Sequence, residues 1–347
     1  MNDHADAALQ INRRFTLQRR PNGLPVAEDF ALLTAPLPSL QPGQLLVRNV
    51  CASLDPAIRG WLDDLPSYLP PVALGDAVRA TTVGRVLASR NPEFAVGQWV
   101  LGLNAIEDVS LVSPGGFTMA IDADAVPSVT NYLSVLGAVG LTAYFGLLEV
   151  GKPSAGDTVL VSGAAGAVGS LVGQIAKIKG CRTIGIAGGA DKCRRLLRDY
   201  GYDVAVDYRG KSVDELAAAI AAAAPDGVDV VFENVGGVVL DATLRNLKRG
   251  ARIALCGLIS EYNSTSGRIG ARNIWELIVK SATISGFLIS DFLPRFGEGA
   301  LEMASWLAQG KLRADEHIDD GIENALPAFL RLFEGSNQGK MMLRIAQ

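Results

Sequence analysis

From about residue 155 onward, short apolar runs alternate with longer segments in which apolar residues recur every three or four positions. The short runs are typical of buried strands, and the longer period is typical of helices that lie on a sheet. Strands that alternate with helices form a parallel sheet with helices on both faces, which is the doubly wound α/β class. We predict strands at 159–162, 181–187, 203–207, 228–233, 252–256 and 283–287, and helices at 170–179, 191–201 and 213–223.

The chain before residue 126 shows a different pattern. Apolar runs of strand length, including residues 44–53 and 82–89, are separated by turn-forming pairs such as Pro42-Gly43. This predicts a β-rich lobe over about residues 14–126, followed by two helical pieces over 132–151. Near the end of the chain we predict helices at 300–310 and 322–334 and a strand at 339–345 that returns to the first lobe.

The composition suits an enzyme of two lobes, because 347 residues exceed one usual domain and 49% of them are hydrophobic, with 38 glycines. No uncharged apolar run reaches the about 18 residues of a membrane-spanning helix, and Met1–Gln10 is polar, unlike a signal peptide. We therefore expect a cytoplasmic protein without a membrane span. A net charge of −4 gives no field for nucleic acid, and we interpret Arg13, Arg14, Arg19 and Arg20 as solvated charge on a strand face.

Cysteine and histidine spacing predicts that the protein binds no metal. A zinc site needs three or four N, S or O ligands in a tetrahedral arrangement. His4 lies in a polar tail and His317 near the end, and the apolar context of Cys181 and Cys256 is typical of buried small side chains. The four cysteines, Cys51, Cys181, Cys193 and Cys256, are scattered without CxxC spacing.

A glycine-rich turn follows the first strand of the alternating region. Glycines between a parallel strand and a helix let backbone N–H groups approach a pyrophosphate more closely than any side chain could. Gly163 is expected to open the turn, Gly166 to leave room for the cofactor, and Gly169 to let the next helix pack on the sheet. The spacing is GxxGxxG, and such glycines also occur in doubly wound folds that bind no nucleotide, so the motif alone leaves both interpretations open.

The end of the second strand favours NADPH over NADH. An NAD site carries an Asp or Glu about 20 residues after the glycine motif, where it binds the adenosine ribose. Here Gly188, Gly189 and Ala190 occupy that place, and Asp191 comes later, where it is expected to cap the next helix. Lys192, with Arg194 and Arg195 behind it, supplies the cations that a 2′-phosphate needs. The alternative is a solvated basic helix start.

Short motifs along nearly the whole chain resemble the zinc-free medium-chain dehydrogenases/reductases, and within them the leukotriene B4 dehydrogenase, prostaglandin reductase and alkenal double-bond reductase group. The resemblance implies a β-rich GroES-like catalytic domain over 1–130 and 300–347, a Rossmann NADPH-binding domain over 131–299, and a homodimer. The matching motifs are Leu54-Asp55-Pro56 with Arg59-Gly60, Gly140 to Gly146, Gly163 to Gly169, Asp191-Lys192-Cys193, Phe232 to Gly237, Cys256 to Asn263, Gly286-Phe287, and Asn337-Gln-Gly-Lys340.

The resemblance also assigns cofactor-binding residues. It implies that Lys192 and Tyr208 bind the 2′-phosphate and that Asn234 closes over the cofactor. Each of four residues has an alternative role: Tyr208 as a surface aromatic, Asn234 as a turn former, Phe287 as a core residue and Asn337 as a loop cap. The full implied set is Gly166, Ala167, Val168, Gly169, Gly188, Lys192, Tyr208, Asn234, Cys256, Gly257, Leu258, Ile259, Ser260, Tyr262, Phe287, Leu288, Ile289 and Asn337.

The implied reaction is hydride transfer from NADPH to the β-carbon of an α,β-unsaturated ketone or aldehyde, which leaves an enolate to be stabilised without a metal. Tyr262 is the expected catalytic donor, and the alternative is that it only positions the cofactor. Many family members have a tyrosine where this chain has Ala57, so Trp61 and Tyr68 are candidate substrate contacts, unless they are loop anchors. Arg59 is interpreted as a structural ion-pair partner.

Three functions follow from these residues. The first is a metal-free, NADPH-dependent 2-alkenal or enone reductase, an oxidoreductase that acts on CH–CH groups of a small molecule. The second is a quinone reductase on the same fold, and the third is an NADPH-binding protein with little catalysis. The sequence does not choose among alkenals, cyclic enones, prostanoid-like ketones and curcumin-like diketones.

Overall fold

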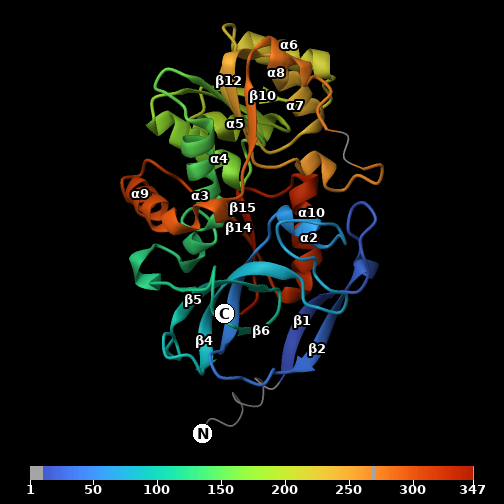
Figure 1. The fold of residues 1–347 in the computed structure, drawn as a ribbon, viewed down its shortest axis with the longest axis vertical. Coiled ribbons are helices and arrows are strands. Elements are labelled where there is room, and N and C mark those ends of the chain that lie inside the picture. The colour runs from blue at the N-terminus through green and yellow to red at the C-terminus, as the bar shows by residue number, and fades with distance from the viewer. Residues whose placement is uncertain (1–10, 268–269, 347) are drawn as a thin grey trace. The chain divides into compact units, whose positions relative to one another are not determined.

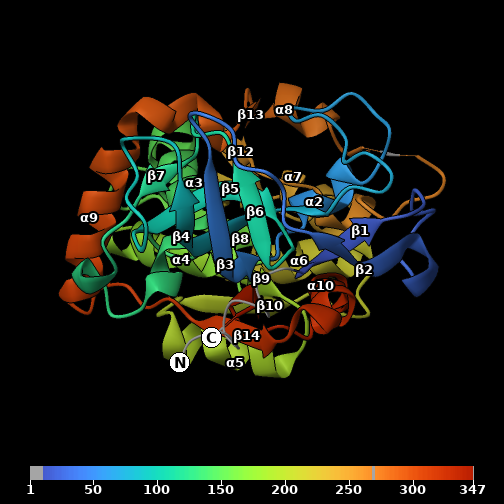
Figure 2. The same ribbon diagram turned by 90° about the horizontal axis from the view of Figure 1, so that it is seen from below.

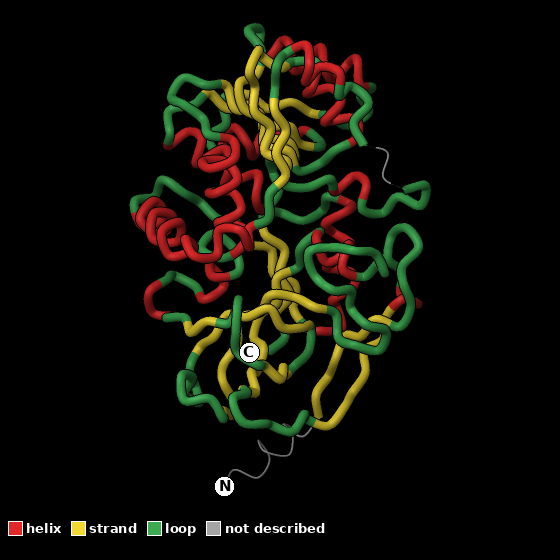
Figure 3. The backbone as a smooth tube through the Cα atoms, viewed as in Figure 1, coloured by secondary structure: helices red, strands yellow, loops and turns green. Residues whose placement is uncertain are grey.

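The structure, a computed structural model, describes residues 11–267 and 270–346 and divides into two compact units. The N-terminal unit takes the described chain up to Leu133, residues 316–337 and the chain from Met341 onward. The central unit takes Ser134–Asp315 and the short segment Gln338–Lys340. Figure 3 shows that each unit is built around a stack of strands, and that most of the helices belong to the central unit.

The N-terminal unit contains two antiparallel sheets. Strand β1 (Ile11–Leu17) pairs with β2 (Phe30–Pro36), and a larger sheet has the order β14-β15-β3-β4-β5-β7, with β6 also paired to β3 (Figure 2). The predicted strands 44–53, 82–89 and 339–345 are confirmed, and the last returns to this unit because Met342 pairs with Ser53. The strands of the larger sheet are β3 (Leu45–Ser53), β4 (Arg79–Ser89), β5 (Trp99–Ala105), β6 (Val109–Val112), β7 (Met119–Ala120), β14 (Glu316–Asp320) and β15 (Lys340–Arg344).

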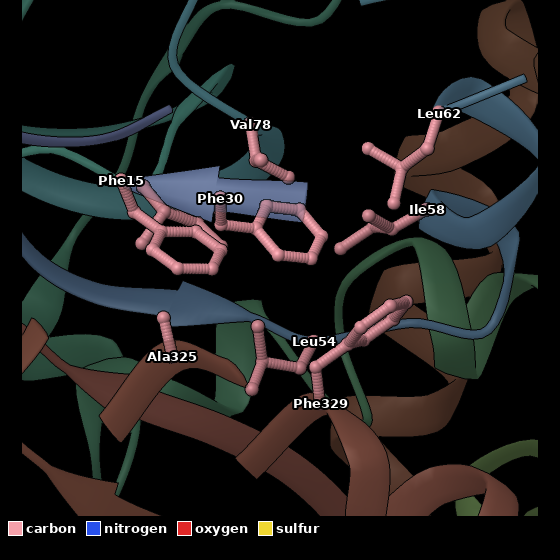
Figure 4. A pocket seen from close by; sticks show the side chains of 9 residues that line it. Phe15, Phe30, Leu54, Ile58, Leu62, Val78, Ala325 and Phe329 are labelled. Carbon is pink, nitrogen blue, oxygen red and sulfur yellow. The ribbon is translucent and has the colours of Figure 1, made fainter. Parts of the chain in front are cut away.

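Two helices close the core of the N-terminal unit. Helix α2 (Ala57–Trp61) and helix α10 (Ala325–Glu334) pack their apolar side chains against β1 and the end of β3. The core holds a small cavity of about 10 Å³, where Phe15 stacks on Phe30 with ring centroids 4.8 Å apart (Figure 4). A space of this size holds about one water molecule, and its lining is apolar, so it is a packing defect and not a ligand site.

The arginines near the start of the chain form ion pairs or hydrogen bonds, although the side chains of Arg13 and Arg19 remain 43% and 60% exposed, so their interpretation as solvated charge holds only in part. Each finds its partner on a segment that is distant in sequence, which no local pattern reveals. The partners are Asp108 for Arg13 at 2.9 Å, Glu107 for Arg14 at 3.0 Å, Asp29 for Arg19 at 2.9 Å, and the carbonyls of Leu62 and Val72 for Arg20 at 2.9 and 2.6 Å.

The central unit has a six-stranded parallel sheet in the order β10-β9-β8-β11-β12-β13, so the predicted doubly wound sheet is confirmed. Since the strands are parallel, their carboxyl ends meet at one edge, which is where open α/β sheets bind ligands. The strands are β8 (Thr158–Ser162), β9 (Arg182–Ala187), β10 (Val204–Asp207), β11 (Val228–Glu233), β12 (Leu247–Leu255) and β13 (Thr283–Gly286).

Helices cover both faces of this sheet. Figure 1 shows α3 (Ala138–Phe145) and α4 (Ala167–Ile178) on one side, and α6 (Val213–Ala223) and α7 (Gly237–Leu244) on the other. Helix α6 begins with a capping box in which the Ser212 hydroxyl accepts the Glu215 N–H and the Glu215 carboxylate accepts the Ser212 N–H. The remaining helices are α5 (Ala190–Asp199), α8 (Trp275–Val279) and α9 (Phe296–Ala308).

Helices α7 and α8 and strand β14 are among the elements that were not predicted, and each lacks the period that reveals such elements. Helix α7 buries Val239, Leu240, Ala242 and Leu244 around most of its circumference, so it has no polar face. Helix α8 has only five residues, and the sequence of β14 is almost entirely polar. Residues 300–315, which the sequence predicts to join the first lobe, lie in the central unit, since α9 packs on α3.

Candidate functional site

The glycine turn after β8 has the geometry expected of a phosphate-binding loop. Gly163 has a φ of +59°, which opens the turn, and Gly166 precedes α4 without a side-chain cap on the first N–H groups of that helix. A Cβ at Gly169 would stand 2.4 Å from the carbonyl oxygen of Gly163, so only glycine lets α4 approach the turn. The positive end of α4 therefore has its backbone donors open to an anion.

The segment Gln338–Lys340 borders the same turn within the central unit. Gly339 forms a parallel bridge with Gly166, and the Lys340 N–H donates to the carbonyl of Asp315 at 2.8 Å. Gly339 has a φ of +74°, and a Cβ there would stand 2.1 Å from the Asp315 oxygen. Of the motif Asn337-Gln-Gly-Lys340, only Asn337, which is buried, was assigned to the site from the sequence. Gly339 in the same motif was the signal for a close backbone contact.

The end of β9 carries glycines where an NAD site would carry an acid. The Tyr208 ring and the Arg209 guanidinium lie over Gly188, and each comes within 3.1 Å of the place where a Cβ would stand. The nearest acid, Asp207, is committed to the backbone: it accepts the Gly189 N–H at 2.8 Å and the Arg209 N–H at 3.0 Å. These bonds, led by the one from Gly189, hold the pKa of Asp207 below its ordinary value.

Lys192 lies in the first turn of α5, near the Arg209 guanidinium. Burial lowers the pKa of Lys192, and the charges of Arg209 and Arg195 lower it further. Arg195 is paired with Asp315 at 2.8 Å, whereas Lys192 and Arg209 form no ion pair among residues 11–267 and 270–346. Two neighbouring cations without an acidic partner suit a dianion, because its negative charges would offset the repulsion between the two cations.

The N-terminus of α5 corrects one prediction. Gly189 stands at the cap position, and the side chain of Asp191 is exposed and pairs with Arg194. Asp191 therefore does not cap the helix. Arg194 and Arg195 were predicted to supply charge to the 2′-phosphate together with Lys192. In the structure both are instead paired with acids, Arg194 with Asp191 and Arg195 with Asp315.

The turn after β11 is tied to the turn after β8. The Asn234 N–H donates to the Ser162 hydroxyl at 2.7 Å, and the Asn234 side-chain amide donates to the Ser162 carbonyl, also at 2.7 Å. Gly236 and Gly237 have φ values of +79° and +51°, so the chain reverses there into α7. The side chain of Asn234 thus forms the turn, which supports the alternative interpretation of this residue.

The segment Cys256–Tyr262 follows β12 and is hydrogen-bonded to the turn after β11. The carbonyl of Glu233 accepts the N–H groups of Cys256 and Gly257 at 2.9 and 3.1 Å. The Tyr262 hydroxyl folds back onto its own segment, where it accepts the Leu258 N–H at 3.3 Å and lies 2.9 Å from the Cβ position of Gly257. A side chain at residue 257 would therefore displace the tyrosine.

The residues after β13 are held by an aromatic contact. The half-buried Phe287 meets Phe232 edge-on, with ring centroids 6.2 Å apart. A Cβ at Gly146 would stand 2.3 Å from the Phe287 ring, so this glycine makes room for the contact. Phe287 accordingly has a packing role, whereas Leu288 is exposed and Ile289 begins the 3₁₀ helix Ile289–Arg295.

The predicted substrate contacts belong to the N-terminal unit. Ala57 opens α2, and Trp61 at the end of α2 is part of the hydrophobic core. Tyr68 is 53% exposed and stands edge-on to Trp61, with ring centroids 6.3 Å apart. The prediction for Arg59 is confirmed: it is buried, pairs with Asp63 at 2.6 Å and donates to backbone carbonyls.

Metal and membrane features are both absent from residues 11–267 and 270–346. In that part of the chain no group of three or more His, Cys, Asp or Glu side chains is placed to hold a metal ion. None of the described helices is long and apolar enough to cross a membrane.

Known proteins share this arrangement. Residues 13–120 match the family model described as the N-terminal domain of oxidoreductase, and residues 167–306 match the model described as zinc-binding dehydrogenase. The NADPH-dependent curcumin reductase of Escherichia coli (strain K12) is 42% identical, over 97% of this chain and 98% of the relative. The 2-alkenal reductase (NADP(+)-dependent) of Nicotiana tabacum is 35% identical, over 97% of this chain and 98% of the relative.

A solved structure agrees over the same length. CurA in complex with NADPH from Vibrio vulnificus matches with a TM-score of 0.91 and 43% sequence identity, over 96% of this chain and 99% of that chain. This chain belongs to the zinc-free medium-chain dehydrogenases/reductases. The predicted family and fold class are therefore confirmed. The description of the second family model names zinc, but residues 11–267 and 270–346 hold no group of three or more His, Cys, Asp or Glu side chains placed to bind that ion.

Proposed function

We propose that this protein is an NADPH-dependent reductase of the activated C=C bond of α,β-unsaturated ketones or aldehydes. The observation that carries the proposal is the pair Lys192 and Arg209, two cations without an acidic partner at the end of β9. The relatives support it, since they include reductases of curcumin and of 2-alkenals.

The residues of the central unit fit the cofactor. The backbone N–H groups of Ala167, Val168 and Gly169 would hold the pyrophosphate, because α4 starts there without a side-chain cap. Lys192, Tyr208 and Arg209 would hold the 2′-phosphate beside Gly188, where a Cβ would stand only 3.1 Å from the side chains of Tyr208 and Arg209. The nicotinamide side would be formed by Asn234, Cys256, Gly257, Leu258, Ile259, Ser260 and Tyr262, with Phe287, Leu288, Ile289 and Asn337 around them.

Bound NADPH supplies the hydride for the β-carbon of the substrate. The chain itself then has to stabilise the enolate oxygen, and the Tyr262 hydroxyl is the proposed donor. This hydroxyl accepts the Leu258 N–H, which fixes the oxygen in place and polarises its O–H bond. A phenol donates a hydrogen bond without carrying charge, so it stabilises an oxyanion at neutral pH.

Tyr262→Phe removes this donor and keeps the ring. We expect turnover on an enone to fall at least about tenfold while the affinity for NADPH stays close to that of the wild type. Initial rates at saturating NADPH, together with a fluorescence titration of NADPH, measure the two quantities. An unchanged turnover would reject a chemical role and leave the tyrosine as a residue that only positions the cofactor.

On the substrate side, Tyr68 is the proposed contact for a flat conjugated molecule. Its exposed ring leans on Trp61, which is itself fixed by the core and by the Arg79 guanidinium 5.9 Å from the Trp61 ring centroid. Trp61 is thus the support and Tyr68 the contact, while Ala57 in place of a larger side chain widens the approach.

The test of the proposed function compares NADPH with NADH on a panel that contains a linear enal, a cyclic enone, a diketone and a benzoquinone. We expect NADPH to be oxidised fastest with an enal or enone. Oxidation only with the benzoquinone would identify a quinone reductase. Binding of NADPH without oxidation on any substrate would identify a non-catalytic nucleotide-binding protein.

We also propose a cytoplasmic homodimer in which the sheet of the central unit continues across two copies. Strand β13 is at the edge of that sheet, and large apolar side chains lie exposed on it and on α8. Three thiols, those of Cys181, Cys193 and Cys256, form no disulfide, which is typical of a reducing compartment. The exposed apolar residues of this edge are Ile274, Trp275, Ile278, Val279 and Ile284.

A further inference from the structure

Glu233, the last residue of β11, is fully buried with 0% exposure. One of its carboxylate oxygens, Oε1, accepts three hydrogen bonds: from the N–H groups of Val235 and Gly236, each at 2.7 Å, and from the Ser162 hydroxyl at 2.9 Å. These donors come from the turn after β11 and from the end of β8. The carboxylate therefore connects the turn after β11 to the end of β8, and both segments contribute to the candidate site.

The other carboxylate oxygen of Glu233, Oε2, is buried and accepts no hydrogen bond from the part of the chain that the structure describes. A buried acceptor left in this way destabilises a fold. Burial raises the pKa of Glu233 to about 6, against the lowering effect of the three donors. An apolar side chain would avoid the cost of a buried carboxylate, but it would leave the three donors of Oε1 without an acceptor.

Glu233 is also mechanically linked to the segment Cys256–Tyr262. Its own carbonyl holds the first two N–H groups of that segment. The next two carbonyls along the turn, those of Asn234 and Val235, accept the N–H groups of Ile259 and Ser260 at 3.1 and 3.0 Å. Whatever fixes the turn 233–236 therefore fixes the backbone from which the Tyr262 side chain projects.

We propose that Glu233 is a positioning residue: its carboxylate fixes the turn 233–236 and thereby the segment 256–262, and proton uptake by this carboxylate slows the reaction. Hydrogen bonds to an ionised acceptor are about twice as strong as those to a neutral one, so a proton loosens all three ties together. The inference rests on the proposed reductase function.

Two titratable side chains face the Glu233 turn from the neighbouring segments. The Cys256 thiol follows β12, and burial together with the Glu233 charge raises its pKa to about 12, so it stays neutral. The Glu261 carboxylate comes from the 3₁₀ helix Ile259–Glu261, with Oε1 3.4 Å from the Cβ position of Gly236. The third neighbour, the Ser162 hydroxyl from β8, does not ionise. Glu233, with a pKa raised by burial to about 6, is the carboxylate that receives the three donors of the turn.

The first test measures kcat at saturating NADPH from pH 5 to 8 for the wild type, Glu233→Gln and Ser162→Ala. The wild type should lose at least about threefold below pH 6, since its carboxylate is then protonated. Glu233→Gln should give a flat profile near the low-pH level of the wild type. Ser162→Ala removes a donor to the carboxylate, so its acidic limb should move to higher pH. Exposed Glu93→Gln should match the wild type.

The 2′-phosphate of NADPH also titrates near pH 6. Its effect on binding does not enter kcat at saturating NADPH, and any remaining effect is the same in the wild type and in the variants. Wild-type and Glu233→Gln profiles that superimpose would overturn the proposal. If Glu233→Gln does not fold, the displaced limb of Ser162→Ala carries the test, and an undisplaced limb would overturn the proposal equally.

The second test uses the protein without NADPH, so it remains valid if the proposed activity fails. An ionised Glu233 destabilises the fold above pH 6, and Glu233→Gln does not ionise. The Tm of Glu233→Gln minus that of the wild type should therefore grow between pH 5 and pH 7.5. A difference that does not change with pH would contradict the titration. Absence of NADPH oxidation on every substrate would reject the reductase function alone.

Discussion

Lys192 and Arg209 lie together at the end of β9, and the acid nearest to them is bound to backbone N–H groups. Replacing Lys192 by Met removes a charged donor, and such hydrogen bonds contribute about 1.5–3 kcal/mol. We expect kcat/KM for NADPH to fall about tenfold or more, with kcat/KM for NADH unchanged. Arg209→Met should shift the same ratio in the same direction.

The matched control for this experiment is Arg194→Met, because Arg194 is a neighbouring exposed arginine that is paired with Asp191. Its preference for NADPH should equal that of the wild type. An equal loss with both dinucleotides in Lys192→Met would mean that the lysine acts on packing and not on the 2′-phosphate.

The sequence predicted this subsite in part. Lys192 follows directly from the absence of an acid after the second strand. Arg209 was missed because its side chain folds back from the next strand over Gly188 and Gly189, which is a tertiary contact without a local pattern. Glu233 was visible as an acid at a strand end, but its burial and its three donors depend on where β8 and the following turn lie.

At the scale of elements, the approach of α4 to the turn after β8 depends on Gly169. Gly169→Ala would place a Cβ 2.4 Å from the Gly163 carbonyl oxygen, so the helix must move away from the loop. We expect a lower Tm and an NADPH Kd at least about tenfold higher, since the backbone donors lose their alignment. Thermal unfolding and a fluorescence titration measure both effects.

Gly297 provides the control, because it also lies in the first turn of a helix, α9, and a Cβ there would meet no atom within 4 Å. Gly297→Ala should keep the NADPH affinity and leave the Tm equal or slightly higher. A normal affinity in Gly169→Ala would show that the loop does not need this close approach.

Elements with a clear period were predicted well. The six strands of the central sheet and helices α5 and α6 lie within a few residues of their expected bounds, and α4 starts three residues before residue 170. Helix α7 was not predicted because it is apolar on nearly all sides, and β14 was not predicted because its sequence is almost entirely polar. Periodicity reports an element only when its two faces differ.

At the scale of the whole molecule, the exposed edge at β13 and α8 is the surface for the proposed second copy. Ile278 is 68% exposed and Trp275 is 66% exposed, which is a large apolar area to leave in water. Ile278→Glu should therefore convert a dimer into a monomer in size-exclusion chromatography with light scattering. Val96→Glu, at an equally exposed valine outside this edge, should leave the dimer intact.

A wild-type protein that is monomeric at micromolar concentration would contradict the dimer.

The sequence indicated the two units through the change of period near residue 130 and through the family motifs. It did not indicate that residues 300–315 belong to the central unit, because that depends on the contact of α9 with α3, whose residues lie more than 150 positions away.

The bridge between Gly166 and Gly339 ties the order of synthesis to the assembly of the site. The loop after β8 is made well before its neighbour Gln338–Lys340, because Gly339 follows Gly166 by 173 residues (339 − 166). During synthesis the nucleotide loop is therefore incomplete until Gln338–Lys340 has been made. Deletion of this short segment would remove part of a site whose other parts lie far upstream.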